Sequence, residues 1–211
     1  MEIIYLEEVA STHIYLKEFI RKNQFTKPLA VVTQFQTNGI GSRDNSWNGA
    51  KGNLFFSFAI SKDSLPNDLK IESASIYFSY LLKEILASCE SKVWIKWPND
   101  FYIDDKKIGG TITTLTKDIL MCGIGINLVK VSEDYGILDV CVNINKLLND
   151  YFDLIASKPS WKHIFSNFEI EFTSSKEYQT TINKEKVSLM DAILLEDGSI
   201  VIDNKKVYSL R

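Results

Sequence analysis

The sequence predicts an α+β fold, in which a mixed, mainly antiparallel sheet packs against helices and a small β domain follows. Short strand-forming runs separated by tight turns fill residues 93–115, a pattern typical of consecutive antiparallel strands. Apolar residues recur at helical spacing after Pro66 and again in residues 142–156 and 161–172. From Asn183 onward the pattern changes to short strands, which indicates a second, smaller unit.

The elements follow from local signals along the chain. Ser11 or Thr12 begins a helix because their hydroxyls can cap its free backbone N–H groups. Strands are expected at 3–6, 29–36, 53–60, 93–96, 101–103, 108–115 and 119–128, and helices from Ser11 or Thr12, at 66–86, 142–156 and 161–172. After a linker at 174–178, strands are expected at 187–196, 199–203 and 205–210, with a turn at Asp197-Gly198. We therefore divide the chain into domains at 1–175 and 176–211.

Composition narrows the class of protein. The 211 residues are 45% hydrophobic and 24% charged, which is ordinary for a globular chain. The net charge of −3 gives no sign of a nucleic-acid surface. Two histidines exclude a histidine-rich metal site, and three widely spaced cysteines indicate reduced thiols in the cytoplasm. The apolar run near the N-terminus is too short to span a membrane. We therefore expect that the protein does not bind a membrane.

The stretch from Lys96 to Gly110 carries the main functional signal. Pro98 cannot donate to a sheet ladder, so the preceding strand should end at Lys96-Trp97 and a turn should follow. A second turn at 104–106 leads to Lys107, which brings Lys96, Asp100 and Lys107 close together. Two cations beside a carboxylate suit a site that holds an anion and moves a proton. The alternative is a surface hairpin with solvated charges.

Two glycine-rich stretches flank this motif in the sequence. Residues 37–52 hold four of the ten glycines and should be mobile until a ligand binds. Such a loop can wrap an anion with backbone N–H groups, or it is simply a flexible surface loop. Residues 123–127 place two glycines in an apolar strand before Asn127, which indicates close backbone approach or a bulge.

Together these stretches resemble the biotin–protein ligases. The Lys96-Trp97-Pro98-Asn99-Asp100 motif, followed by a Lys-Lys pair and Gly-Gly, is similar to the central motif of that family. Ser11-Thr12-His13, the loop at 37–52 and the Gly-Ile-Gly-Ile-Asn run resemble its other motifs and occur in the same order. The resemblance implies a class II synthetase-like catalytic domain with a small SH3-like barrel. It also implies the monofunctional type, without an N-terminal DNA-binding domain.

The resemblance implies an ATP-dependent enzyme that joins biotin to a lysine of a biotin carboxyl carrier protein through biotinyl-5′-AMP. Mg²⁺ would be held by the phosphates, with no firmly assignable protein ligand, and a homodimer is compatible with the resemblance. Lys107 would contact both the biotin carboxylate and the α-phosphate, with Lys96 assisting on the phosphates. Asp100 would orient the incoming lysine amine or accept its proton, or else cap the turn.

The remaining site residues are carried over by motif. Those implied for biotin are Ser11, Thr12, His13, Gln36, Gly39, Ile40, Gly41, Ser42, Lys107, Gly110, Gly123 and Gly125. Those implied for ATP and the adenylate are Arg43, Trp47, Lys96, Asn99, Lys107 and Asn127. His13 stands where the family usually has Asn, and Ile40 and Ser42 stand where it has arginines. Trp47 would cover the adenine or anchor the loop.

Two rival functions remain open. A lipoate or octanoate ligase or transferase shares the fold, but the polar set of Ser11, Thr12 and Gln36 suits a ureido ring better than an aliphatic tail. A non-catalytic biotin- or carrier-binding protein is favoured only by the reduced arginine content of the loop.

Overall fold

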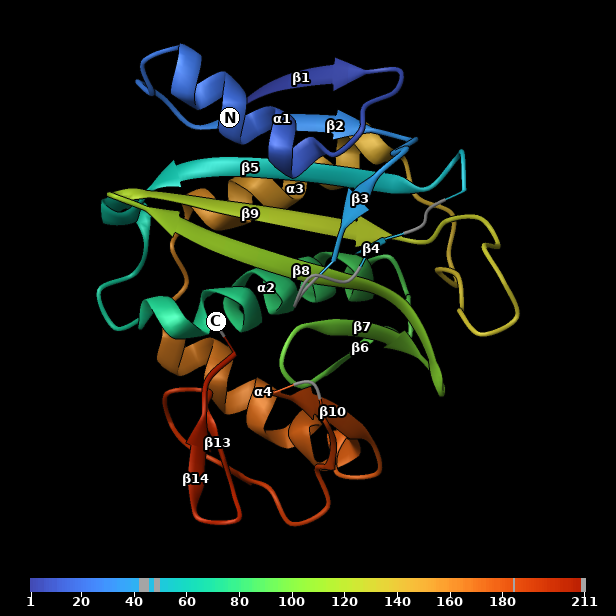
Figure 1. The fold of residues 1–211 in the computed structure, drawn as a ribbon, viewed down its shortest axis with the longest axis vertical. Helices are drawn as coiled ribbons and strands as arrows, with labels where there is room; N and C mark the ends of the chain where they lie inside the picture. The colour runs from blue at the N-terminus through green and yellow to red at the C-terminus, as the bar shows by residue number, and fades with distance from the viewer. Residues whose placement is uncertain (42–45, 48–49, 184, 210–211) are drawn as a thin grey trace.

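The computed structural model describes residues 1–41, 46–47, 50–183 and 185–209. Its centre is a seven-stranded sheet of order β1-β2-β5-β9-β8-β7-β6 (Figure 1). The strands are β1 (Glu2–Leu6), β2 (Leu29–Thr33), β5 (Leu54–Ser61), β6 (Trp94–Lys96), β7 (Asp100–Ile103), β8 (Lys106–Thr116) and β9 (Ile119–Ile126). Only the β1–β2 pair is parallel among these neighbours. The predicted mixed, mainly antiparallel sheet is therefore confirmed.

Helices cover both faces of the sheet because its central strands are apolar on both sides. On β5, Phe56 and Phe58 face one way and meet Tyr151 and Phe152 edge-on, with ring centroids 5.7–6.2 Å apart. This large core also takes in α2 (Ala74–Ser88), α3 (Ile144–Ala156) and α4 (Trp161–Ser175). A smaller core on the other face packs α1 (Thr12–Lys22) on β2, β5 and β9 (Figure 1).

Several predicted boundaries are wrong. The second strand ends at Thr33, where the hydroxyl accepts from Phe35 N–H and starts a turn. The helix expected from Pro66 begins at Ala74, after short 3₁₀ turns at Lys62–Ser64 and Ile71–Ser73. The strand expected at 101–103 begins one residue earlier, at Asp100, which the sequence had placed in the preceding turn. The stretch at 37–52 includes a small two-stranded sheet, β3 (Gly39–Ile40) with β4 (Ser46–Trp47).

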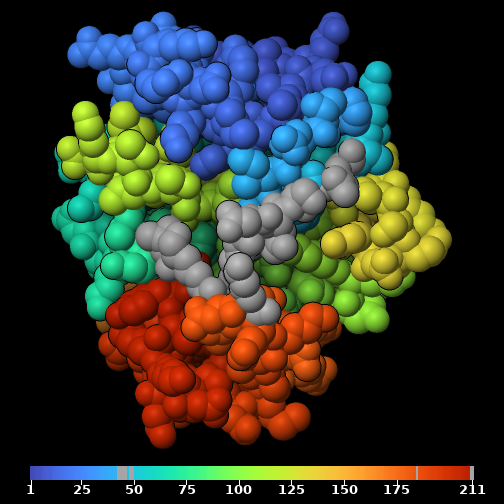
Figure 2. Space-filling model, viewed as in Figure 1, coloured from blue at the N-terminus to red at the C-terminus, as the bar shows by residue number. Residues whose placement is uncertain are grey.

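The C-terminal region forms two small antiparallel sheets. One pairs β10 (Gln179–Ile182) with β11 (Glu185–Ser188), and the other joins β12 (Ile193–Leu194), β13 (Ile200–Ile202) and β14 (Lys205–Val207). The strand predicted at 187–196 is thus interrupted, because the Ser188 hydroxyl accepts from Met190 N–H in a turn. Figure 2 shows this region packed directly against the rest of the molecule at one end.

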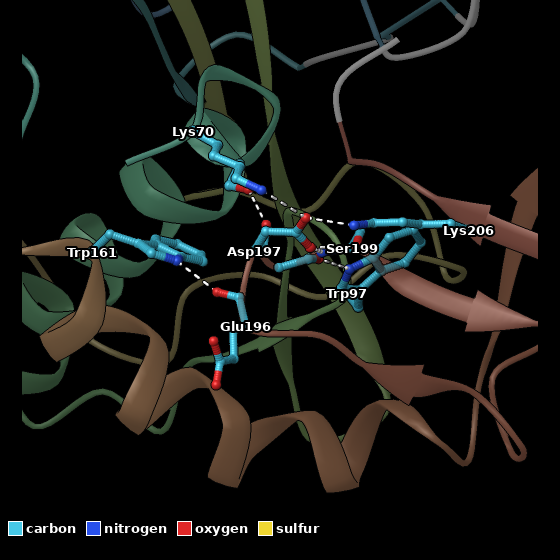
Figure 3. A network of polar contacts seen from close by, with 9 residues as sticks. Lys70, Trp97, Trp161, Glu196, Asp197, Ser199 and Lys206 are labelled. Atoms are coloured by element: carbon cyan, nitrogen blue, oxygen red, sulfur yellow. Dashed lines mark hydrogen bonds and ion pairs between the residues drawn. The ribbon is translucent and has the colours of Figure 1, made fainter. Parts of the chain in front are cut away.

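The turn between β12 and β13 anchors this region (Figure 3). Its Gly198 carbonyl accepts from the Trp97 indole at 2.9 Å, and its Glu196 carbonyl accepts from the Trp161 indole at 2.8 Å. Asp197 pairs with Lys206 at 2.7 Å and Lys70 at 3.4 Å. Burial opposes ionisation of Asp197, but Lys206, Ser199 and Lys70 outweigh it and hold the pKa well below its usual value. No described helix has the length and apolarity needed to span a bilayer.

Candidate functional site

A cavity of about 360 Å³ opens on the α1 face of the sheet, over β5, β9 and β8. It is lined by Ser11, Thr12, His13, Gln36, Ile40, Gly41, Trp47, Phe55, Ser57, Asp100, Lys107, Gly110, Thr111, Ile112, Gly123, Ile124, Gly125 and Tyr135. The lining residues come from segments far apart in the sequence, which the sheet order brings together.

The floor of the cavity is backbone. Gly110 of β8 lies directly opposite Gly125 of β9. Gly123 lies two residues before Gly125 on β9 and therefore on the same face of the sheet. A methyl group built on Gly125 would lie 3.3 Å from the rings of Phe55 and Trp47. One on Gly123 would lie 3.1 Å from Ser57 Oγ. Side chains at these positions would therefore fill the space above the sheet, which explains why glycine occupies them.

A carboxylate between two ammonium groups forms the charged wall. Lys107 Nζ lies 2.6 Å from Asp100 Oδ1, and Lys96 Nζ lies 3.3 Å from Asp100 Oδ2. The predicted convergence of these three residues is confirmed. Lys107 and Asp100 line the cavity, whereas Lys96 lies behind them with its side chain 7% exposed, against 26% for Lys107.

This pairing sets the charge of the wall. Burial alone would raise the pKa of Asp100, but the ammonium groups of Lys107 and Lys96 outweigh it and hold that pKa below its usual value. Asp100 is thus a carboxylate at neutral pH, and the three groups together carry one excess positive charge. Such a wall attracts an anion. Trp47 closes the cavity beside it, with its ring centroid 5.6 Å from Lys107 Nζ.

The opposite end of the cavity is polar and uncharged. Ser11 caps α1, and Thr12 donates to Gln36 Oε1 through both its backbone N–H at 2.7 Å and its hydroxyl at 3.0 Å. His13 Nε2 lies 3.3 Å from the Thr114 hydroxyl. Burial, and then the nearby charge of Lys17, lower the pKa of His13 to about 4, so the ring is neutral at physiological pH. This end suits a neutral polar ring.

The sequence matches the family model described as the biotin/lipoate A/B protein ligase family over residues 5–128. The chain belongs to this family. The predicted resemblance to its biotin–protein ligase members is therefore confirmed.

Individual members of the ligase family align with much of the chain. A crystal structure of biotin acetyl coenzyme A carboxylase synthetase from Helicobacter pylori, with bound biotinylated ATP, is 36% identical, with a TM-score of 0.93. That match covers 98% of this chain and 99% of the other. The chloroplastic biotin–protein ligase 1 of Arabidopsis thaliana is 29% identical over 67% of this chain and 39% of its own length.

Other matches are more distant. The bifunctional ligase/repressor BirA of Bacillus spizizenii is 25% identical over 72% of this chain and 48% of its own. This chain thus spans less than half the length of these two curated ligases. The Aquifex aeolicus biotin protein ligase, at 22% identity and a TM-score of 0.76, shows likeness of fold.

The structure places most of the residues implied by the ligase family around the cavity. Those that line it are Ser11, Thr12, His13, Gln36, Ile40, Gly41, Trp47, Asp100, Lys107, Gly110, Gly123 and Gly125. Gly39 lies outside the lining and packs closely on Gln36 and Trp47. Ser42 and Arg43, implied for biotin and for nucleotide, lie outside the described residues.

Three residues implied for the nucleotide do not line the cavity. They are Lys96, described above, Asn99 and Asn127. The Asn99 side chain donates to the Thr111 carbonyl, which ties the turn after Trp97 to β8. Asn127 donates to the Gly136 carbonyl at 3.2 Å, and its buried Oδ1 has no partner among the described residues. That free acceptor leaves Asn127 able to bind a further donor.

The sequence interpretation did not include several lining residues, among them Ser57, Thr111 and Tyr135. Ser57 carried a usable signal, because it is the only polar side chain within the apolar run from Leu54 to Ile60. Tyr135 carried none, since it comes from a loop whose position depends on the fold.

The site offers little to a metal ion. Among the described residues no group of three His, Cys, Asp or Glu side chains is placed to hold one. Asp100 is the sole carboxylate in the described lining, and both its oxygens are already paired with lysines. The side chains described here therefore do not fit a cation held by protein ligands alone.

Proposed function

We propose that this chain is a biotin–protein ligase, which uses ATP to attach biotin to a lysine of a biotin carboxyl carrier protein through biotinyl-5′-AMP. The proposal depends mainly on the position of Lys107. This lysine lines the cavity and belongs to its charged wall, opposite the neutral polar end. The 36% identical Helicobacter pylori structure, with its bound biotinylated ATP, supports the same ligand chemistry.

In the first step, a biotin carboxylate oxygen attacks the α-phosphorus of ATP and pyrophosphate leaves. This step brings two anions together, so a cation at the meeting point lowers the barrier. Lys107 is the proposed catalytic residue, because its ammonium group is exposed to the cavity and can contact both the carboxylate and the α-phosphate. Lys96 supports it from behind by sharing Asp100, and assists on the phosphates.

In the second step, the carrier lysine amine attacks the acyl carbon, an amide bond forms and AMP leaves. Asp100 is the carboxylate available in the described lining to orient that amine or to accept its proton. Its low pKa makes it a weak base, which favours orientation over proton transfer. In the resting site it also neutralises one of the two lysines.

The remaining ligand contacts are proposed from the cavity lining and the family motifs. Ser11, Thr12, His13 and Gln36 would hold the biotin ring, and Trp47 would lie against the nucleotide. Mg²⁺ would be bound through the ATP phosphates, since the described lining offers no free carboxylate pair for it.

Finer features of the assembly are also proposals. We divide the chain into a class II synthetase-like catalytic domain, 1–175, and an SH3-like barrel, 176–211. The short C-terminal sheets and their anchoring turn support this division. The three free cysteines support a cytoplasmic enzyme, and a homodimer is one assembly to be tested.

Biotin-dependent exchange of pyrophosphate into ATP tests the proposal directly. We expect exchange with biotin, and transfer of biotin to a purified carrier domain when it is added. Biotin binding without exchange would instead indicate a non-catalytic binder. Exchange that depends on lipoate or octanoate, with no response to biotin, would indicate the lipoate branch of the family.

A further inference from the structure

The outer edge of β6 is held by a helix rather than by another strand. β6 is the last strand of the seven-stranded sheet, and no strand in the described part of the chain pairs with its far side. Side chains of α4 accept hydrogen bonds there instead. Ile95 N–H donates to Glu171 Oε2 at 3.3 Å. The backbone N–H of Trp97, just after the strand, donates to Ser175 Oγ at 3.0 Å. These two acceptors replace the carbonyl groups of a neighbouring strand.

The spacing of these four residues allows both bonds to form side by side. Alternate residues of a strand direct their N–H groups to the same edge, and Ile95 and Trp97 are two residues apart. Residues four apart lie on the same face of a helix, as Glu171 and Ser175 do. Four residues advance a helix by about 6 Å. Two residues advance a strand by roughly 6.6 Å, so the two spacings match.

Glu171 is itself fixed from the other side by α2. Its Oε1 is paired with the Lys83 ammonium group, which also lies 4.9 Å from the centroid of the Tyr80 ring. The side chains of Glu171 and Lys83 are 19% and 17% exposed, so the pair is only partly screened by water. With one carboxylate oxygen bound in this way, the other is kept at the edge of β6.

The strand held by these contacts carries Lys96. Lys96 is the last residue of β6 and lies between the two bonded N–H groups. It is paired directly with Asp100 of β7, and its ammonium group is 3.3 Å from Asp100 Oδ2. A strand of three residues at the edge of a sheet opens locally when the bonds on one of its sides are lost. The α4 contacts therefore limit movement of the backbone that places Lys96.

We propose that Glu171 is a positioning residue of the adenylation step, whose carboxylate holds the edge of β6 and so keeps the Lys96 ammonium group at Asp100. The inference rests on the proposed function and deepens it, because Lys96 is the residue assigned there to assist on the phosphates. Glu171 does not line the cavity. It acts on the reaction only through Lys96, and this dependence can be measured.

A double-mutant cycle with Lys96 tests the dependence in biotin-dependent pyrophosphate exchange by the full chain. We expect Glu171→Ala to lower kcat about tenfold, which is the effect of losing one hydrogen bond to a charged group. In a Lys96→Met background the same change should alter the residual kcat by less than about twofold. A purely structural role would instead lower kcat by the same factor in both backgrounds.

Chemical labelling of lysines reports the position of Lys96 without relying on activity. Because the Lys96 side chain is nearly buried, acetic anhydride should acetylate it slowly. Glu171→Ala should raise its acetylation severalfold, as detected by mass spectrometry, while Lys107 on β8 keeps its own level. Glu171→Gln retains an amide oxygen for Ile95 N–H, although it removes the charge paired with Lys83. It should therefore restore most of the kcat and the protection of Lys96.

Glu169→Ala is the matched control, because Glu169 is an exposed glutamate on the same helix, two residues before Glu171. It should change neither kcat nor the acetylation of Lys96. Ser175→Ala removes the other edge bond and decides the matter if thermal melting shows that Glu171→Ala does not fold. Equal factors in the two backgrounds, or unchanged acetylation of Lys96, overturn the inference. Absence of biotin-dependent exchange in the unmodified chain overturns the proposed function instead, and acetylation then still tests how Lys96 is held.

Discussion

The indole N–H of Trp97 donates to the carbonyl of Gly198 at 2.9 Å, across 101 residues of sequence. Trp97 directly follows Lys96, and Gly198 lies in the turn that anchors the C-terminal strands. The bond therefore connects the charged wall of the cavity to the C-terminal region through one buried side chain.

Trp97→Phe should loosen that connection. The change removes the only N–H that Trp97 offers to Gly198 and leaves a small void, so we expect unfolding free energy to fall by about 2 kcal/mol. Hydrogen exchange should become faster in residues 193–207. Trp161→Phe removes the corresponding hydrogen bond from the Trp161 indole to the Glu196 carbonyl. It should have a similar effect on hydrogen exchange in these residues but a smaller effect on the rate of adenylate formation. Unchanged protection in Trp97→Phe would contradict the anchoring role.

Lys107→Met should nearly abolish adenylate formation. It removes the cation exposed to the cavity, and loss of such a group costs about a hundredfold or more in kcat. Lys106→Met is the matched control, because Lys106 is exposed and its Nζ instead contacts the Glu133 carbonyl at 3.1 Å. Pyrophosphate exchange measures both. Comparable activity in the two variants would remove Lys107 from the mechanism.

Asp100→Asn should destabilise the fold as well as slow the reaction. It leaves the buried Lys96 ammonium without its counter-charge, which costs about 3–5 kcal/mol in comparable pairs. Because the folded-state pKa of Asp100 is lowered, its stabilising effect is present above the unfolded pKa and is lost as pH falls through the folded value. Urea unfolding of both forms at neutral pH measures the difference. Equal midpoints would show that Lys96 needs no counter-charge.

His13 should make the protein less stable in mild acid. Its folded pKa of about 4 lies below the ordinary value of 6.5, so the unfolded chain binds a proton that the folded chain does not. The resulting stability is complete above the unfolded pKa and declines as pH falls toward 4, by about 2–3 kcal/mol between roughly pH 7 and pH 4.5. His13→Asn should remove that part of the slope, which denaturant unfolding at several pH values detects. An unchanged slope would mean that His13 titrates normally.

Gly109→Ala and Gly110→Ala should differ sharply although the residues are neighbours. A methyl group on Gly109 would lie 2.5 Å from the Gly125 carbonyl oxygen, so the sheet would have to shift. One on Gly110 would lie 3.3 Å from Asp100 and 3.6 Å from Lys107, which intrudes on the cavity and spares the ladder. We expect the first to lose stability and the second to keep it while losing activity. Thermal melting with pyrophosphate exchange separates the two.

The features best predicted from the sequence are those that depend on a short stretch of the chain. The hairpins between Trp94 and Thr116 follow from local turns, and the convergence of Lys96, Asp100 and Lys107 follows from those hairpins. The start of α2 was missed because Ser73 is bonded to the Asp197 carbonyl, a contact between distant parts of the chain. Tyr135 was missed for a similar reason, since it reaches the cavity only through loop placement.

The glycine pair across β8 and β9 has a consequence for how the cavity can change between relatives. Gly110 is paired with Gly125, and the backbone hydrogen bonds between β8 and β9 fix the position of the peptide groups there. These peptide groups form the floor on which a ligand would lie. Ligand preference would then be altered by substitutions of lining side chains such as His13, Ile40 or Tyr135, while the glycine base stays constant. Engineering a new acyl substrate for this scaffold should begin at these side chains.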